Sequence, residues 1–348
     1  TVRVIEAGHP IPDRAGEEGA REILALTRRA REDDLLIGLW SGGGSALLPA
    51  PLPGITLAQK KRVTGLLLKS GAAITEINTV RKHLSQIKGG RLAAASSATM
   101  VNLILSDVVG DRLDVIASGP TVPDPTRFSD AIEILKRYRL WAKIGSPVRN
   151  VLNEGKEGRR EETPKPGHPR WRRIHHLLIG NGELAVKAAA RLIEEIGCRP
   201  KILTSSLVGE AREAGKVWSA LAKEEHRKRK RGDRPVCLLA GGETTVTVRG
   251  SGRGGRCQEF ALSAALSISD LPGITVAAFS TDGTDGPTDA AGAIADGETC
   301  LRGERKNLDA LRCLNENNAY AFFNALGGLI RTGPTRNHLN DLYLALIG

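Results

Sequence analysis

The chain has 348 residues, enough for two domains with separate hydrophobic cores. Its formal net charge of +11 would suit a nucleic-acid-binding protein, but only 3% of its residues are aromatic, too few to build stacking platforms for bases. No apolar run is long enough to span a bilayer, and the five cysteines form no CxxC pair. We therefore expect a cytoplasmic protein with neither a nucleic-acid nor a membrane partner, and we leave its oligomeric state open.

The hydrophobic pattern predicts strands and helices in alternation. In chain order, we expect a helix over residues 17–31, a strand over 35–40, a helix over 76–88, strands over 101–105 and 174–179, a helix over 183–196, a strand over 200–204, a helix over 210–231, strands over 236–240 and 244–248, a helix over 257–266, and strands over 274–279 and 342–347. The continuous apolar run over 35–40 is typical of a strand buried on both faces. This alternation predicts an α/β fold of two domains with largely parallel, doubly wound sheets and an active-site cleft between the domains.

Two glycine-rich loops are candidate phosphate sites because each follows a predicted strand. The first is Ser41–Gly42–Gly43–Gly44–Ser45, beyond the strand over 35–40, where ligands bind in open α/β sheets. The second runs from Gly250 to the helix over 257–266 and contains Gly252, Arg253, Gly254, Gly255 and Arg256. Glycines let backbone N–H groups reach an anion, and the arginines add positive charge. The alternatives are a flexible turn at the first loop and a tight strand–helix turn with solvated arginines at the second.

Acidic residues follow two other strands. Asp107 comes after the strand over 101–105, and Asp282 and Asp285 lie in the loop after the strand over 274–279. A carboxylate at the end of a strand can hold Mg²⁺ or accept a proton.

A row of polar residues shares one face of the helix predicted over 76–88. Arg81, Ser85 and Lys88 are spaced three and four residues apart, so this face could meet phosphates or could simply be solvated.

The combination of candidate phosphate-binding loops with acidic residues that can hold Mg²⁺ favours phosphoryl transfer as the reaction. Neither a GxxxxGK[ST] motif nor the set of protein-kinase motifs is present. Gly250, Gly252 and Gly255 also satisfy the GxGxxG pattern of dinucleotide-binding folds, and Asp282 follows the next strand. An NAD(P)H-dependent oxidoreductase is therefore the alternative.

Six motifs together resemble the glycerate 2-kinase family. They are Ser41–Pro51, Asn78–Gly90, Ser106–Asp111, Ser118–Thr121, Gly252–Arg256 and Gly283–Thr288. The resemblance implies a kinase that phosphorylates the 2-hydroxyl of D-glycerate, using ATP and Mg²⁺. Residues 1–225 resemble the N-terminal kinase domain, with a charged linker or insertion at 153–172, and residues 234–348 resemble the C-terminal MOFRL domain. The same family has often been labelled hydroxypyruvate reductase.

The resemblance also suggests roles for the candidate residues. The Ser41–Ser45 loop, Lys88 and the loop containing Gly252, Arg253, Gly254 and Gly255 would bind the phosphates of ATP. Arg256 would stabilise the transferred phosphoryl group. Asp107 and Asp282 would serve in catalysis and Asp285 would hold Mg²⁺, although any of these acids could bind the metal or take the hydroxyl proton. Which loop binds ATP and which binds glycerate stays open.

The chain departs from the family pattern at its start and at Cys257, where the family has asparagine. Family members begin with a further segment whose lysine is thought to be catalytic, so we expect an N-terminally truncated chain that binds ATP but phosphorylates glycerate slowly. The non-enzymatic alternative is a truncated chain that binds nucleotide without catalysis.

Overall fold

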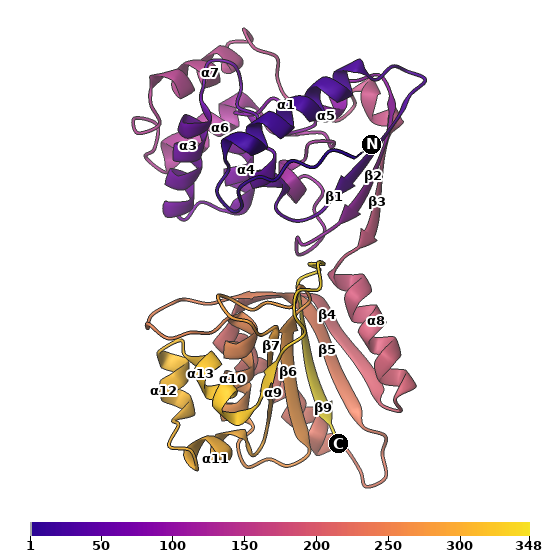
Figure 1. Ribbon diagram of the computed structural model, residues 1–348, viewed down its shortest axis with the longest axis vertical. Coiled ribbons are helices and arrows are strands. Elements are labelled where there is room, and N and C mark those ends of the chain that lie inside the picture. The colour runs from indigo at the N-terminus through magenta and orange to yellow at the C-terminus, as the bar shows by residue number, and fades with distance from the viewer. Residues whose placement is uncertain (1) are drawn as a thin grey trace. The chain divides into compact units, whose positions relative to one another are not determined.

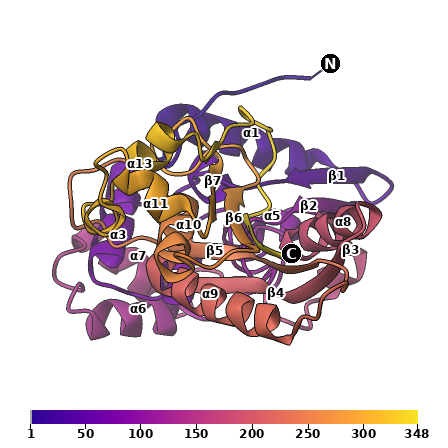
Figure 2. The same ribbon diagram turned by 90° about the horizontal axis from the view of Figure 1, so that it is seen from below.

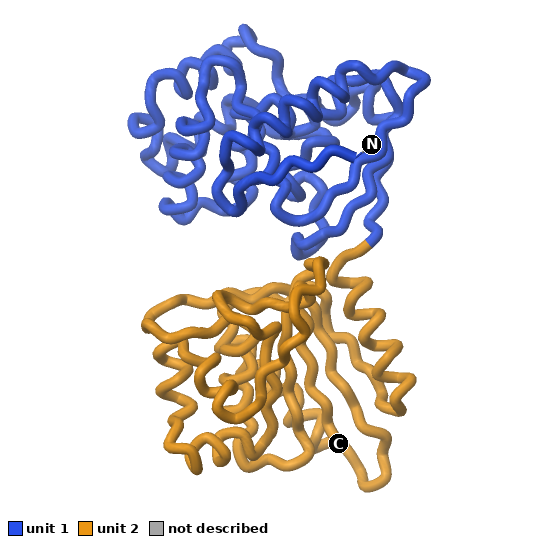
Figure 3. Tube along the Cα trace, in the orientation of Figure 1, with its two compact units in different colours: residues 1–179 blue, residues 180–348 orange. Residues whose placement is uncertain are grey.

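The computed structural model describes residues 2–348, which form two compact α/β units that divide between Ile179 and Gly180 (Figure 3). The division falls well before the predicted boundary at 225–234. Residues 182–228 supply α8 (Gly182–Glu195), β4 (Arg199–Glu210) and α9 (Ala211–Lys228), which pack with the second sheet rather than with the first. No helix of the described residues has both the length and the apolar character needed to cross a membrane.

Unit 1 combines a small sheet with a cluster of helices. Its strands are β1 (Leu35–Trp40), β2 (Thr99–Leu105) and β3 (Ile174–Gly180), in the order β1-β2-β3, with β1 parallel to β2. Its helices are α1 (Arg14–Arg29), α2 (Gly44–Leu47), α3 (Leu57–Lys69), α4 (Ile74–Lys82), α5 (Arg91–Ala94), α6 (Phe128–Arg137) and α7 (Ser146–Lys156), with short 3-10 turns at Ile116–Ser118 and Pro169–Arg173. Figure 1 shows α3, α4, α6 and α7 grouped together, and their apolar faces form one core around Phe128.

The start of α3 and the end of α4 show how local sequence sets these elements. Thr56 and Gln59 form the predicted capping box, with hydrogen bonds of 2.8 and 3.2 Å between each side chain and the other residue's backbone N–H. Helix α4 ends at Lys82, six residues before the predicted end, and the chain reaches the left-handed Gly89 and Gly90 through turns.

Strand β1 has the predicted bounds but is less buried than expected. Leu35, Ile37 and Leu39 are 57%, 63% and 77% exposed, while the residues between them are half-buried. β1 is an edge strand, and within residues 2–348 only one of its faces is covered. The expectation of a strand buried on both faces is therefore wrong for the described chain.

The segment predicted as a charged linker, residues 153–172, is an integral part of unit 1. The Glu162 carboxylate accepts a hydrogen bond from the backbone N–H of Phe128 at 3.0 Å and is hydrogen-bonded to His83 Nε2 at 2.9 Å. Arg170 is buried and donates to the carbonyls of Ala93 and Ala98. The charged residues of this segment therefore serve internal hydrogen bonds, which composition alone does not reveal.

Unit 2 is built on a six-stranded sheet with helices on both faces. Its strand order is β4-β5-β9-β6-β7-β8, with β5 Val236–Thr245, β6 Ile274–Ser280, β7 Gly292–Asp296, β8 Leu329–Ile330 and β9 Asp341–Ile347. Helix α8 covers one face, and α9 and α10 (Arg256–Ser267) cover the other, as Figures 1 and 2 show. Three short helices pack beside α10: α11 (Thr299–Glu304), α12 (Ala310–Asn315) and α13 (Ala319–Leu326).

The doubly wound arrangement is confirmed, but the second sheet is mixed rather than largely parallel. Only β4 and β5 are parallel neighbours, because the last strand, β9, inserts antiparallel between β5 and β6. This insertion places the start of β9, at Asp341, beside the carboxyl ends of β5 and β6 and so next to the loops that follow them.

Candidate active site

The loop after β1 is shaped by three consecutive glycines. Gly43 has a φ of +81°, a left-handed conformation that favours glycine. A Cβ on Gly42 would lie 2.3 Å from Asp107 Oδ2, and a Cβ on Gly44 would lie 2.8 Å from the Cβ of Ala117. The glycines therefore allow the acid after β2 and the turn at Ala117 to pack directly against the loop.

A polar pocket of about 590 Å³ opens beside this loop. Its walls include the Ser41–Ser45 loop, side chains of α3 and α4, the buried Lys88, and Asp107. The Ser45 and Ser118 hydroxyls, one from the loop and one from the predicted Ser118–Thr121 turn, are hydrogen-bonded at 2.7 Å. The structure thus brings together three predicted site elements that lie far apart in the chain: the loop, Lys88 and Asp107.

Positive charge dominates the polar pocket. Its cationic lining residues are Lys60, Lys61, Arg81 and Lys88. Asp107 is the one carboxylate among the described residues that line it. Lys88 Nζ donates to the carbonyl of Ala117 at 3.0 Å, and burial, followed by the charges of Lys60 and Arg81, holds the pKa of Lys88 well below its usual value. Such a group of cations is suited to an anionic ligand.

Lys60 was not predicted from the sequence. It is followed by another lysine, and such a pair on a helix is usually a solvated surface. A signal was present, however, because Lys60, Val63 and Leu67 recur at helical spacing and all three are buried. A lysine in the apolar register of an amphipathic helix marks a buried amine.

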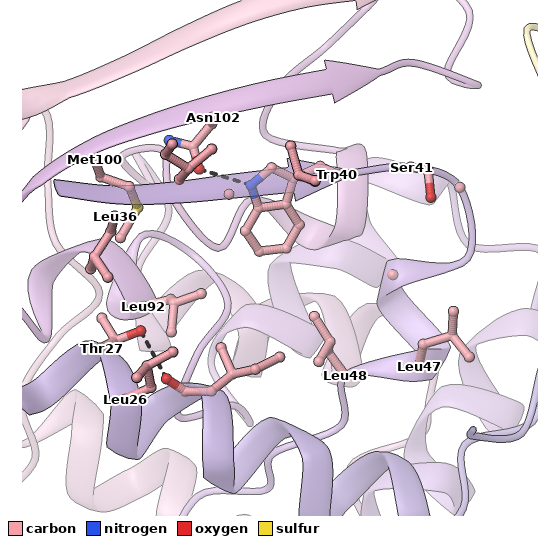
Figure 4. Close-up of a pocket in the computed structure, with 16 residues that line it drawn as sticks. Leu26, Thr27, Leu36, Trp40, Ser41, Leu47, Leu48, Leu92, Met100 and Asn102 are labelled. Carbon is pink, nitrogen blue, oxygen red and sulfur yellow. Dashed lines mark hydrogen bonds between the residues drawn. The ribbon is translucent and has the colours of Figure 1, made fainter. Parts of the chain in front are cut away.

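A second depression, on the α1 side of β1, is apolar. Leu26 of α1, Leu36 and Trp40 of β1, and Met100 of β2 line it (Figure 4). Trp40 Nε1 donates to Asn102 Oδ1 at 2.8 Å, which satisfies the one polar atom of the indole ring. None of the described residues lining this apolar groove is charged, so the polar pocket is the better site for an anionic substrate.

In unit 2, the glycine-rich loop after β5 is held by residues 316–318. The N–H of Gly250 donates to Asn317 Oδ1 at 2.9 Å, and that of Gly252 donates to the Glu316 carbonyl at 2.9 Å. A Cβ on either glycine would lie within 2.5 Å of the same Glu316 oxygen. These N–H groups are therefore used within the protein, and the tight-turn alternative describes this loop better than the phosphate-binding prediction.

Gly254 and Gly255 lead into α10, whose N-terminus is capped by Asp285. The Asp285 carboxylate accepts hydrogen bonds from the N–H groups of Cys257 at 3.1 Å and Gln258 at 2.9 Å, and a Cβ on Gly255 would lie 2.3 Å from that carboxyl group. Burial raises the pKa of Asp285 to about 6, although the two backbone hydrogen bonds lower it. The carboxylate thus occupies the helix end that the prediction gave to a phosphate.

Asp285 was predicted to hold Mg²⁺, and the structure gives it this capping role instead. Its side chain is buried and fully engaged. In residues 2–348, no three His, Cys, Asp or Glu side chains are grouped so that they could hold a metal ion.

Arg256 was predicted to stabilise the transferred phosphoryl group, but in the structure two carboxylates hold its guanidinium. Its Nε and Nη2 lie 2.6 and 2.9 Å from the two carboxylate oxygens of Asp341, and its Nη1 lies 3.0 Å from Glu243 Oε1. Burial alone would lower the pKa of Arg256, but its hydrogen bonds to Asp341 and the charges of Asp341 and Glu243 raise it above the usual value. The guanidinium thus joins α10 to β9 and β5, a structural role that the sequence did not predict.

Arg253 and Asp282 are the more accessible candidates of unit 2. Arg253 is exposed, with its guanidinium 4.5 Å from the ring centre of Tyr320. Asp282 accepts a hydrogen bond from the N–H of Thr284 at 2.8 Å through Oδ1, and its Oδ2 lies 3.6 Å from His338 Nδ1. Asp282 stays a candidate for the proton acceptor.

Comparisons with known proteins cover nearly the whole chain. A Pyrococcus horikoshii protein named glycerate 2-kinase is 48% identical over 347 residues, which are 99% of this chain and 78% of that protein. The chain belongs to the glycerate kinase family. The crystal structure of the Thermotoga maritima glycerate kinase matches it with a TM-score of 0.90 at 43% identity, over 99% of this chain and 80% of that one.

Two family models divide the chain. Residues 1–153 match a domain of unknown function, DUF4147, and residues 236–341 match the MOFRL family. An Agrobacterium vitis relative, 42% identical over 350 residues that are all of this chain and 78% of that protein, carries a provisional hydroxypyruvate reductase name. Names within the glycerate kinase family therefore cover both candidate reactions, and the structure of the site has to separate them.

Proposed function

We propose that this chain is a glycerate 2-kinase, which transfers the γ-phosphoryl group of ATP to the 2-hydroxyl of D-glycerate. Relatives that are 48% and 45% identical over 99% of the chain carry this name. The observation that supports it most within the structure is the polar pocket, because four basic side chains line it and both substrates are anions.

Within the pocket, the Ser41–Ser45 loop and Lys88 would bind the anionic groups of a substrate. Phosphoryl transfer needs positioning and electrostatic stabilisation more than covalent chemistry from the protein. A preorganised cation beside a hydroxyl-bearing loop supplies both, since it neutralises charge without reorganising at the moment of reaction.

Asp107 is the acid of the pocket and packs against Gly42 of the loop. It would either accept the proton of the 2-hydroxyl or help to hold Mg²⁺. Mg²⁺ often takes only one or two carboxylates and completes its shell with substrate phosphates and water, so a full protein cage is not needed. The metal, when bound, neutralises phosphate charge. Asp282 of unit 2 is a second candidate for these roles, since its side chain is partly exposed to solvent.

The NAD(P)H-dependent alternative is weaker because the GxGxxG motif that suggested it makes hydrogen bonds within the protein. A dinucleotide fingerprint needs free backbone N–H groups and an open helix N-terminus for the pyrophosphate. Here Gly250 and Gly252 donate to residues 316–317, and Asp285 caps the helix. The five cysteines are buried and unpaired, which supports the reducing cytoplasm as the compartment.

The proposal is tested by ADP release from ATP and Mg²⁺ that depends on D-glycerate. Wild type should show this activity, and Lys88→Met should lose it while Lys69→Met, at an exposed lysine outside the pocket, keeps most of it. ATP binding without glycerate-dependent ADP release would instead favour a non-catalytic nucleotide-binding chain. Circular dichroism spectra of both variants would check that the fold survives.

A further inference from the structure

One polar group of the polar pocket has no partner in the protein. Lys60 projects from α3, its side chain is 6% exposed, and its Nζ is buried without a hydrogen-bond acceptor. The one carboxylate that raises its pKa, that of Glu17, acts on it through its charge and not through a hydrogen bond. A buried amine without an acceptor is rare in native proteins, since it gives up hydration without compensation.

The titratable groups around Lys60 come from three helices and from segments between elements. Arg81 of α4 and Lys88 after it are basic, Glu17 of α1 is acidic, and Asp107, His9 and Lys61 line the same pocket. Burial, followed by the charge of Arg81, lowers the pKa of Lys60 to about 7, although the charge of Glu17 raises it. Near neutral pH, a large share of the Lys60 side chains is thus uncharged in the ligand-free protein.

We propose that Lys60 is a substrate-binding residue that contacts an anionic oxygen of the ligand and takes up one proton from solvent when the ligand binds. The ligand oxygen supplies the acceptor that Lys60 Nζ lacks, together with a negative charge beside it, so the ammonium form becomes the stable one. The inference rests on the proposed function. D-glycerate would offer Lys60 a carboxylate oxygen, and ATP would offer it a phosphate oxygen. Lys88 is different, since the carbonyl of Ala117 already accepts its hydrogen bond.

The proposal predicts that affinity depends on pH. Above about pH 7, each added pH unit should weaken binding up to about tenfold, because a proton must be taken up with the ligand. At about pH 8, where about nine-tenths of the Lys60 amines are neutral, ligand binding should take up close to one proton per site. The uptake ends above the raised pKa of the complex.

Isothermal titration calorimetry in pairs of buffers with different ionisation enthalpies measures this uptake directly. D-glycerate, ATP with Mg²⁺, and inorganic phosphate are the three probes. Lys60→Met should abolish most of the uptake and flatten the pH dependence of affinity. Lys69→Met, at an exposed lysine of the same helix that lies outside the pocket, should change neither, and His9→Gln measures the share due to the histidine. Lys60→Arg, which stays charged, should bind the anion without the uptake.

The three probes also distinguish the two sources of the anion. Uptake with glycerate alone places Lys60 at the carboxylate, whereas uptake with ATP and phosphate places it at a phosphate. Equal uptake and equal affinity in wild type and Lys60→Met, with every probe, would overturn the proposal. Because Lys60→Met removes an unpaired buried amine, it should fold, and a thermal melt checks this.

The inference and the proposed function can fail separately. Glycerate phosphorylation by wild type without uptake dependent on Lys60 would overturn the inference and leave the kinase function standing. Phosphate binding with this uptake, in a chain that does not phosphorylate glycerate, would support the anion site and contradict the function.

Discussion

Arg256→Ala separates a structural role from a catalytic one. The change removes a bidentate partner from Asp341, whose fully buried side chain would keep hydrogen bonds to the Tyr343 hydroxyl, at 3.0 Å, and to the Cys257 thiol. Removing one member of a buried ion pair costs about 3–5 kcal/mol, because the other charge stays buried. The Arg256 side chain is 25% exposed, so water can partly replace it. We therefore expect the free energy of unfolding to fall by about 3 kcal/mol, the lower end of this range.

For a unit the size of residues 180–348, this loss corresponds to a drop in melting temperature of about 6–12 °C. Urea unfolding followed by tryptophan fluorescence measures the free energy, since Trp218 lies in the core beside α10. The matched control is the double variant Arg256→Ala/Asp341→Asn. It should recover part of the loss, since the unpaired charge is gone.

The opposite result would refute this reasoning. If Arg256→Ala unfolds like wild type but its turnover falls by about 10³ or more, the guanidinium acts on the transferred phosphoryl group, as the sequence suggested. A stable variant with unchanged turnover would remove Arg256 from both accounts.

Three further predictions follow from buried or exposed side chains. Because the pKa of Lys60 is about 7 in the folded chain and 10.5 in the unfolded one, unfolding takes up a proton between these values, and stability should rise with pH by up to about 1.4 kcal/mol per pH unit. Lys60→Met should remove this rise in urea melts between about pH 7 and 9, and an unchanged slope would contradict the buried amine. Asp285→Ala should lose about 1–3 kcal/mol of stability without changing the Mg²⁺ concentration needed for turnover, whereas an increased requirement would restore a metal role. The exposed Leu35, Ile37 and Leu39 leave an apolar face on β1, so we expect concentration-dependent self-association in sedimentation velocity. Leu39→Thr should reduce it with a stability change within about 0.5 kcal/mol, and undiminished association would show that this face is not its cause.

Local periodicity predicted most elements within a few residues, because amphipathic patterns and caps act over one or two turns. The capping box at Thr56 and the strand over 35–40 are examples. The insertion of β9 between β5 and β6 was not predictable in this way, since it depends on pairing between segments about seventy to one hundred residues apart along the printed sequence. The internal hydrogen bonds of Glu162 and Arg170 were missed for the same reason, because their partners lie elsewhere in unit 1.

The candidate site was predictable where its residues follow strands. The rule that ligands bind at the carboxyl ends of parallel strands brought the Ser41–Ser45 loop and Asp107 together, and β1 and β2 are parallel neighbours. The rule failed in unit 2, where Asp341 and Asp285 satisfy the groups that were assigned to phosphates. A charge that looks unpaired in sequence can be paired in space, and a lysine that looks solvated, such as Lys60, can be buried.

The identity of the phosphorylated product tests the central claim most directly. The chain would be incubated with D-glycerate, ATP and Mg²⁺, and the mixture examined by ³¹P nuclear magnetic resonance, with enough enzyme that slow turnover still accumulates product. The account predicts 2-phosphoglycerate and ADP in equal amounts, and no oxidation of NADH or NADPH when hydroxypyruvate is supplied instead. Reduction of hydroxypyruvate with no phosphorylated glycerate would contradict it.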